Sequence, residues 1–286
     1  MNKIPNELTT YLSSIQKVEF HNSTIIFYTK EGVYLYLPVS CERVMYSYLE
    51  QIGFNNFVIP INNSGNYSLF KISSYEKTNP IDLLCELYKK SSQQKNFSVN
   101  EKSQIANRLK KDNVFLMNYY HDMQDRIEEM YYPMESFYKL LLNISQIYKL
   151  LIIGNYYIDK WMDTSTYYDE VLVLKNIDAE NFIDNIIIDF SRANRDYYVF
   201  ELANYYQKYY LSENIINDIS FFEESFKMSD SDRYLFYGLI SIIWEVNGEN
   251  TEDVNNINKY VKNTLSYLLK KYEKDKEQEE DMLEEK

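Results

Sequence analysis

The sequence predicts an α+β fold with two lobes, a small strand-rich lobe followed by a larger helical one. Short β-rich runs separated by turn residues fill the chain up to a polar connector near residue 77. Helical periodicity then dominates, and one short β-rich interlude interrupts it at 171–190. A chain of 286 residues is long enough for two lobes that share a cleft. We expect lobes at 1–77 and 78–271, followed by a charged tail at 272–286.

The first lobe is predicted to contain strands and one helix. Lys30-Glu31-Gly32 separates two runs of β-branched and aromatic residues, which predicts a hairpin. Gly53 ends the helical pattern that follows, and the polar run 62–66 predicts a turn. In chain order we expect strands at 24–28 and 33–37, a helix at 41–53, and strands at 57–61 and 67–72.

The second lobe is predicted to be a set of packed helices. Ser98 and Glu101 have the spacing of a capping box, and Pro133 suits the first turn of a long helix. Apolar residues at helical spacing between 137 and 151 predict the core face of that helix. In chain order we expect helices at 81–90, 98–129 with a break near Asp112-Asn113, 133–162, 198–211, 214–228, 230–246 and 251–271, with strands at 171–174 and 186–188 in the interlude.

Composition excludes several classes of function. The net charge of −13 repels nucleic-acid phosphates and anionic membrane surfaces. The sequence has only two histidines, His21 and His121, which are too few for a three-histidine zinc site. A surface or capping role is expected for each. Cys41 and Cys85 lie far apart and are expected to be reduced core thiols. The start of the chain has no leader pattern, and the apolar stretch 234–244 is too short to span a bilayer. We expect a cytoplasmic, acidic protein with no nucleic-acid partner and no membrane insertion.

The β-rich interlude contains the residue most typical of a site. Ile187-Ile188-Asp189-Phe190 places a carboxylate directly after a buried apolar run. Asp189 is therefore expected to leave the end of a strand and to face the cleft. A divalent cation at that point needs oxygen ligands of this kind.

The order of a strand-rich lobe, a connector and a helical lobe interrupted by a strand pair resembles kinase-like phosphotransferases. The stretch 188–202 resembles the corresponding segment of spore coat proteins related to aminoglycoside phosphotransferases, with Asp189-Phe190 followed by Asp196 and by Glu201-Leu202. The lobe order covers most of the chain, and the motifs lie within 171–202. The resemblance implies a bilobal protein-kinase-like fold and a spore-associated role. For Asp196 and Glu201 we expect structural roles as anchors of the loop, and no part in the chemistry. The resemblance also implies that Asp189 and a loop asparagine bind Mg²⁺.

The loop before that strand departs from the pattern of the family. The family's loop reads like HxDxxxxN, whereas this chain reads Leu174-Lys175-Asn176-Ile177-Asp178-Ala179-Glu180-Asn181. Alignment of Asn181 with the metal-binding asparagine puts Lys175 in place of the histidine and deletes the catalytic aspartate. Alignment of Asp178 with that aspartate leaves Asn181 two positions early. Either way the histidine is absent and the loop is short, so a base there loses its position near an acceptor hydroxyl.

The first lobe departs from the family as well. The family's second hairpin strand brings a lysine to the nucleotide phosphates, and Val33-Tyr34-Leu35-Tyr36-Leu37 contains none. The sequence has no glycine-rich phosphate loop, since Gly32 stands alone in its turn. With less positive charge to neutralise the phosphates, the cleft of an acidic protein is expected to resist ATP.

Two functions are compatible with these features. The first is a catalytically degenerate kinase-like protein, or pseudokinase, which needs no cofactor and acts as a binding or structural module for a protein partner. The alternative is an active ATP-dependent small-molecule phosphotransferase. In it Asp178 is the catalytic base, Asn181 and Asp189 bind the metal of Mg-ATP, and the acceptor is a cation such as an aminoglycoside or choline.

Two simpler interpretations stay open. In the first, Asp189 caps a turn and Asn181 bonds to backbone within a loop, so that neither residue binds a metal. In the second, the chain is an α+β interaction protein with no chemistry in a cleft.

Overall fold

The computed structural model describes residues 15–21, 24–38, 43–64, 67–175 and 177–284. The chain consists of two compact units, each of which has most of its contacts within itself. The first unit combines Met1–Gln93 with Glu170–Tyr198, and the second combines Gln94–Asp169 with Val199–Lys286. The β-rich interlude therefore belongs to the same unit as the N-terminal strands. The lobe boundary near residue 77 stays a prediction.

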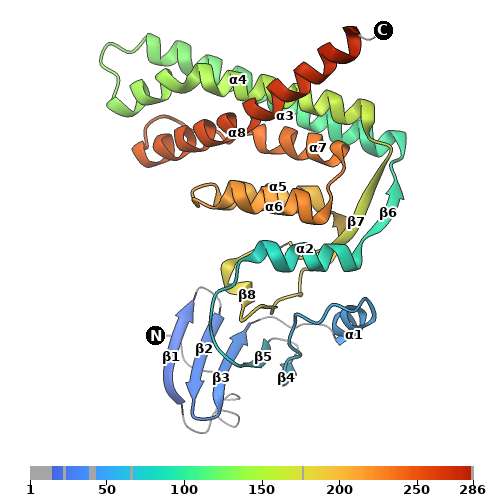
Figure 1. The fold of residues 1–286 in the computed structure, drawn as a ribbon. Coiled ribbons are helices and arrows are strands. Elements are labelled where there is room, and N and C mark those ends of the chain that lie inside the picture. Colours follow the sequence, from blue (N-terminus) through green and yellow to red (C-terminus); the bar gives the residue numbers. More distant parts are fainter. Residues whose placement is uncertain (1–14, 22–23, 39–42, 65–66, 176, 285–286) are drawn as a thin grey trace. The chain divides into compact units, whose positions relative to one another are not determined.

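An antiparallel sheet of five strands is the main element of the first unit (Figure 1). Its order is β1-β2-β3-β5-β4. Ile26, Leu35 and Phe70 lie opposite one another on adjacent strands and are fully buried, as expected for β-branched and large apolar residues in a sheet. The strands are β1 (Ile15–His21), β2 (Thr24–Thr29), β3 (Gly32–Leu37), β4 (Asn62–Ser64) and β5 (Tyr67–Ile72).

Two helices accompany the sheet in the first unit. α1 (Arg43–Gln51) buries Tyr46 and Leu49. α2 (Pro80–Ser91) begins after Asn79, whose side chain accepts a hydrogen bond from the backbone of Ile81 at 3.1 Å. Pro80 suits the first helical position because the N–H that it lacks would have no partner within the helix.

The interlude at 171–190 and the residues on either side of it form four short strands, β7 (Tyr167–Val173), β8 (Phe182–Ile183), β9 (Ile186–Ile187) and β10 (Asn194–Tyr197). β7 pairs antiparallel with β10, and β8 pairs antiparallel with β9. The β8–β9 loop consists of Asp184 and Asn185, whose φ angles are 51° and 59°. Two consecutive residues with positive φ are typical of a type I′ turn, and Asp and Asn tolerate this conformation well.

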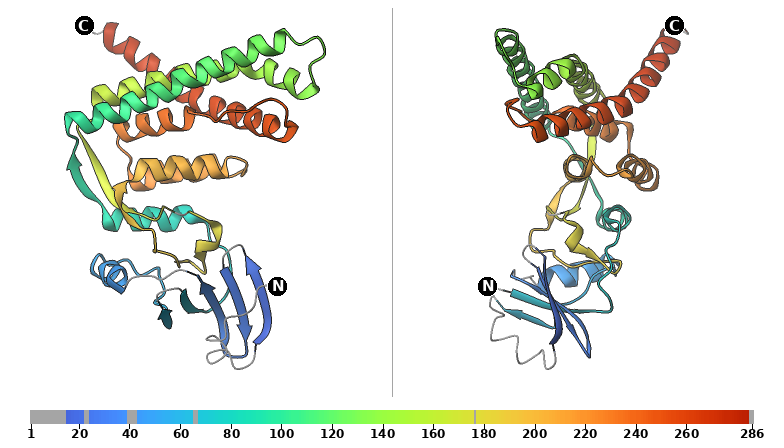
Figure 2. Two further views of the ribbon diagram at one scale, coloured as in Figure 1. Left: turned by 180° about the vertical axis from the view of Figure 1, so that it is seen from behind. Right: turned by 90° about the vertical axis from the view of Figure 1, so that its left-hand side faces the viewer.

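The described part of the second unit is largely helical, with α3 (Val99–Glu128), α4 (Glu135–Thr164), α5 (Tyr198–Tyr209), α6 (Ile215–Phe226), α7 (Asp230–Ser241) and α8 (Thr251–Glu284). The short strand β6 (Gln93–Asn96) leads into it. α3 and α4 lie side by side as a helical hairpin in both views of Figure 2. α7 packs against α4 and α8 and is buried along most of its surface, including Leu235, Phe236 and Ile240.

Several predicted elements are confirmed. The strand at 67–72 has the predicted bounds. Ser98 and Glu101 form the predicted capping box, with the Glu101 backbone N–H donating to Ser98 Oγ at 3.2 Å. The α+β class, with a small antiparallel sheet and a helical region, is also as predicted.

Other expectations are wrong. Residues 57–61 form no strand, and this segment contributes only a single bridge, from Phe57 to Ile187. The strand begins instead at Asn62, where a turn was expected. The break near Asp112-Asn113 is absent. Asn113 is fully buried in a continuous α3, and its side-chain amide donates to the carbonyl of Leu151 on α4 at 2.9 Å.

Three other elements also differ from prediction: one was not predicted, and two end at other residues than expected. β1 was not predicted, because Lys17 and Glu19 interrupt its apolar pattern. α7 ends at Ser241 instead of 246, and α8 continues to Glu284 instead of ending near 271. The start of the helix predicted at 41–53 lies partly outside the described residues.

Cys85 is a buried free thiol, as predicted, and burial raises its pKa. Cys41 lies outside the described residues. His121 lies on the exposed side of α3, 3.5 Å from Asp125. Within the described ranges, no helix combines the length and apolar character needed to cross a membrane.

Candidate functional site

Asn181 and Asp189 lie together at the base of the β8–β9 hairpin, in the first unit. Asn181 Nδ2 donates to the carbonyl of Asp189 at 3.1 Å, and its Oδ1 accepts from the Asp189 backbone N–H. The Asn181 carbonyl accepts from Ile188 N–H at 3.1 Å. Asn181 is only 5 % exposed. Both ends of its amide are therefore used to hold the backbone of Asp189 beside the loop.

The Asp189 side chain also supports its own loop. Its Oδ1 accepts a hydrogen bond from the backbone N–H of Ser191 at 2.8 Å. An aspartate that bonds the backbone two residues ahead forms an Asx-turn, which reverses the chain after the strand. Asn181 and Asp189 thus make the hydrogen bonds that are expected if Asp189 caps a turn and Asn181 bonds to the backbone of the loop. Their role as metal ligands stays a prediction.

Asp178 lies on the same short loop as Asn181. Its carbonyl accepts from the Asn181 backbone N–H at 2.8 Å, which closes one turn of 3₁₀ helix over Ala179–Asn181. The loop is therefore wound into a tight turn and has no extended stretch between the two residues. Asp178 is partly buried, and its role as the catalytic base stays a prediction.

The β8–β9 hairpin is fixed to the connector that follows β5. The backbone N–H of Asp184 donates to the carbonyl of Glu76 at 2.7 Å, and Thr78 N–H donates to the carbonyl of Phe182 at 3.1 Å. The backbone N–H of Asn185 donates to Thr78 Oγ1 at 2.8 Å. These bonds join residues that are far apart in the sequence, so they place the loop of Asn181 firmly within the first unit.

Lys175, which follows β7, forms an ion pair with Asp196 on β10. Lys175 has a φ of 61°, a left-handed conformation that residues other than glycine adopt rarely. Asp196 also accepts from the backbone N–H of Tyr197 at 2.8 Å. These contacts are compatible with the loop-anchoring role expected of Asp196. Glu201 is 5 % exposed on α5, in the second unit, and its expected anchoring role stays a prediction.

Arg195 is a structural residue that sequence reasoning missed. Its guanidinium donates to Glu170 Oε2 at 2.8 Å, to the Tyr48 hydroxyl at 2.6 Å and to the carbonyls of Ser91 and Glu170 at 2.9 and 3.0 Å. It therefore connects β10 with β7, with α1 and with the end of α2. An arginine provides several fixed donors, so one side chain can bind three segments.

Replacement of Arg195 by Ala should lower the free energy of unfolding by about 2 kcal/mol, because charge-assisted hydrogen bonds to partly buried groups are lost. Urea denaturation followed by circular dichroism measures the effect. Arg192, three residues earlier and exposed, is the matched control, and Arg192→Ala should stay near wild type. Equal effects of the two changes would contradict the proposed role of Arg195.

Mg-ATP is the group that this kind of loop implies, and the residues present do not fit it well. Asn181 Oδ1 and Asp189 Oδ1 both already accept backbone hydrogen bonds. β3 contains no lysine for the phosphates. Two of the oxygens expected to bind the metal are thus engaged with backbone N–H groups, and β3 supplies no lysine to neutralise a triphosphate.

The architecture defines a protein with a protein-kinase-like fold, as the sequence predicted. An aminoglycoside phosphotransferase from Alicyclobacillus acidocaldarius is a similar solved structure, with a TM-score of 0.63 and 10 % identity over 96 % of this chain and 97 % of that chain. The choline kinase LicA from Streptococcus pneumoniae also matches, with a TM-score of 0.37 and 12 % identity over 92 % of this chain and 95 % of that chain. The first similarity establishes the fold, while the second is too distant to support an argument. The sequence matches no protein-family model and no curated protein.

Proposed function

We propose that this chain is a catalytically degenerate kinase-like protein, which acts as a binding or structural module and transfers no phosphate. The hydrogen bonds of Asn181 are the observation that supports this proposal most strongly. Both ends of its buried amide bond the backbone of Asp189. A side chain engaged in this way stabilises the loop, and it offers little to a metal ion.

Two further features support the same proposal. Asp178 and Asn181 are separated by a single 3₁₀ turn, so a base at Asp178 has little freedom to reach an acceptor. The absence of a lysine from β3 and the net charge of −13 both disfavour a bound triphosphate. We expect such a module to bind a protein partner. Spore association is part of this proposal because of the sequence resemblance to spore coat proteins.

A thermal-shift titration with Mg-ATP tests the proposal. We expect no change in the unfolding midpoint of the wild-type protein. A ligand present at about one hundred times its dissociation constant would stabilise the native state by about 2.7 kcal/mol, which is readily measured. Asp189→Asn is the matched variant, because an asparagine keeps the Asx-turn and removes the charge.

The same titration distinguishes the alternative of an active phosphotransferase. A rise in the midpoint of the wild-type protein that disappears in Asp189→Asn would contradict the proposal. Phosphate transfer to a cationic acceptor that is lost in Asp178→Asn would contradict it as well. With no shift in either protein, and no transfer, the degenerate interpretation holds.

A further inference from the structure

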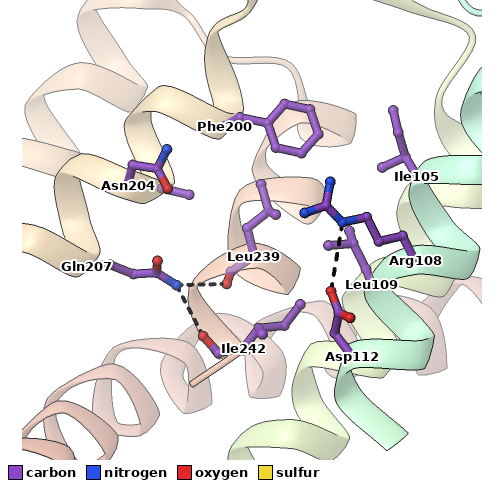
Figure 3. A pocket seen from close by; sticks show the side chains of 10 residues that line it. Ile105, Arg108, Leu109, Asp112, Phe200, Asn204, Gln207, Leu239 and Ile242 are labelled. Atoms are coloured by element: carbon purple, nitrogen blue, oxygen red, sulfur yellow. Dashed lines mark hydrogen bonds and ion pairs between the residues drawn. The ribbon is translucent and has the colours of Figure 1, made fainter. Parts of the chain in front are cut away.

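A cavity of about 320 Å³ lies within the helical unit, between α3, α5 and α7 (Figure 3). This volume is at the lower end of the range of small-molecule sites. Its apolar lining comes from all three helices and consists of Ile105, Leu109, Phe200, Ala203, Leu239 and Ile242. The cavity shares no residue with the loop of Asn181, so an inference from it is independent of the proposed function.

The wall between α5 and α7 is held in place by Gln207. Its Nε2 donates to the carbonyls of Leu239 and Ile242 at 3.3 and 3.1 Å, as the dashed lines in Figure 3 show. These carbonyls lie at the end of α7, where helical hydrogen bonding stops. The side chain therefore satisfies the end of one helix and fixes its distance from the next, which gives a preformed site.

Two opposite charges lie at the mouth of the cavity. Arg108 and Asp112 are one turn apart on α3, and Arg108 Nε lies 4.0 Å from the Asp112 carboxylate. Their side chains are 83 % and 49 % exposed. An ion pair this long and this exposed is weak, so each charge can exchange its partner for a ligand at little cost.

We propose that this cavity binds a small zwitterion with an apolar body, of the class of free apolar α-amino acids. The ligand's carboxylate pairs with Arg108, its ammonium pairs with Asp112, and its side chain enters the apolar cavity. A purely anionic ligand meets Asp112 and the negative field of the chain, while a purely cationic one meets Arg108. A neutral zwitterion satisfies both charges.

Isothermal titration calorimetry with L-leucine tests the proposal on the full chain. We expect a dissociation constant of about 1 mM or below. L-Leucinamide lacks the carboxylate, 4-methylpentanoate lacks the ammonium, and glycine lacks the apolar body. Each should bind about tenfold more weakly or worse, since each loses one of the three interactions.

Variants identify the site. Arg108→Gln and Asp112→Asn should each weaken L-leucine binding about tenfold without affecting the fold, because both side chains are exposed. Glu135→Gln, which removes the same kind of i,i+4 ion pair on α4, is the control and should leave binding unchanged. The proposal is overturned if wild type binds no L-leucine, if the analogues bind equally well, or if the two variants bind like the control.

Discussion

Raising the pH above about 10 is expected to unfold the helical unit, with tyrosine ionisation and loss of helix occurring together. Burial is the main cause of the strongly raised pKa of six tyrosines of this unit, and it raises the pKa of Tyr206 to about 12. The other five are Tyr120, Tyr157, Tyr237, Tyr260 and Tyr267. All six have less than a tenth of their surface exposed.

The sign of the effect follows from proton linkage. A tyrosine of the unfolded chain loses its proton near pH 10, whereas a buried tyrosine with a raised pKa keeps it. Above about pH 10 the unfolded state therefore binds fewer protons, and the free energy of unfolding falls by about 1.4 kcal/mol per pH unit for each such tyrosine. For Tyr206, whose pKa is about 12, the loss reaches about 2.3 kcal/mol at its folded pKa and approaches about 2.7 kcal/mol above it. The other five tyrosines shift the balance in the same direction, and the stability of a domain is usually only about 5–15 kcal/mol.

Glu223 explains why two of these tyrosines resist ionisation so strongly. Its buried carboxylate accepts hydrogen bonds from the hydroxyls of Tyr237 and Tyr267 at 2.7 and 3.1 Å, and from Lys271 Nζ at 3.2 Å. Loss of either hydroxyl proton would remove a hydrogen bond and place a second negative charge beside Glu223. After burial, this repulsion is a further cause of the raised pKa of both tyrosines.

The measurement is a pH titration that records tyrosinate absorbance and far-ultraviolet circular dichroism on the same samples. Tyr206→Phe removes one of the coupled protons, so its stability should fall less steeply above pH 10, although loss of the hydrogen bond to Thr264 costs about 1 kcal/mol at neutral pH. Tyr131→Phe is the control, because Tyr131 is 87 % exposed. If the buried tyrosines ionised fully while the helical signal stayed constant, the explanation would be wrong.

The elements that could be predicted from sequence are those with a local cause. The capping box of Ser98 and Glu101 depends on residues of one turn, and the strand at 67–72 depends on its own β-branched and aromatic residues. The position of Asp189 after a buried apolar run was also readable, because Ile187 and Ile188 precede it directly. Local patterns of this kind specify an element before any tertiary contact forms.

Contacts between distant segments could not be predicted in the same way. Arg195 donates hydrogen bonds to Tyr48 and to Glu170, which lie far from it in the sequence. The residues next to Arg195 do not indicate these partners. The continuous α3 depends on Asn113, whose amide is satisfied by Leu151 of the next helix. One missed signal was local: Asp184-Asn185 between two isoleucines is typical of a two-residue hairpin turn, and both residues have the positive φ angles that such a turn favours.

Gly154→Ala is expected to destabilise the helical unit by about 3 kcal/mol, because α4 and α7 cross too closely to accept another carbon atom. A Cβ at position 154 would lie 1.7 Å from Ser241 Oγ and 2.6 Å from Ser241 Cβ. Gly238 on α7 has the same role, since a Cβ there would lie 2.8 Å from Ile158. Alanine favours a helix over glycine by about 1 kcal/mol, so the steric effect outweighs a gain in helix propensity.

A double-mutant cycle with Ser241 separates this clash from other effects. Ser241→Gly removes both atoms that a Cβ at position 154 would meet and should recover most of the stability lost in Gly154→Ala. Ser241→Ala removes only the hydroxyl and leaves the contact of 2.6 Å, so its recovery should be partial. Urea denaturation of the single and double variants gives the coupling energy, provided that the slope with denaturant is unchanged. Equal recovery by Ser241→Ala and Ser241→Gly would show that the two helices can move apart, and a Gly154→Ala protein as stable as wild type would rule out the close crossing altogether.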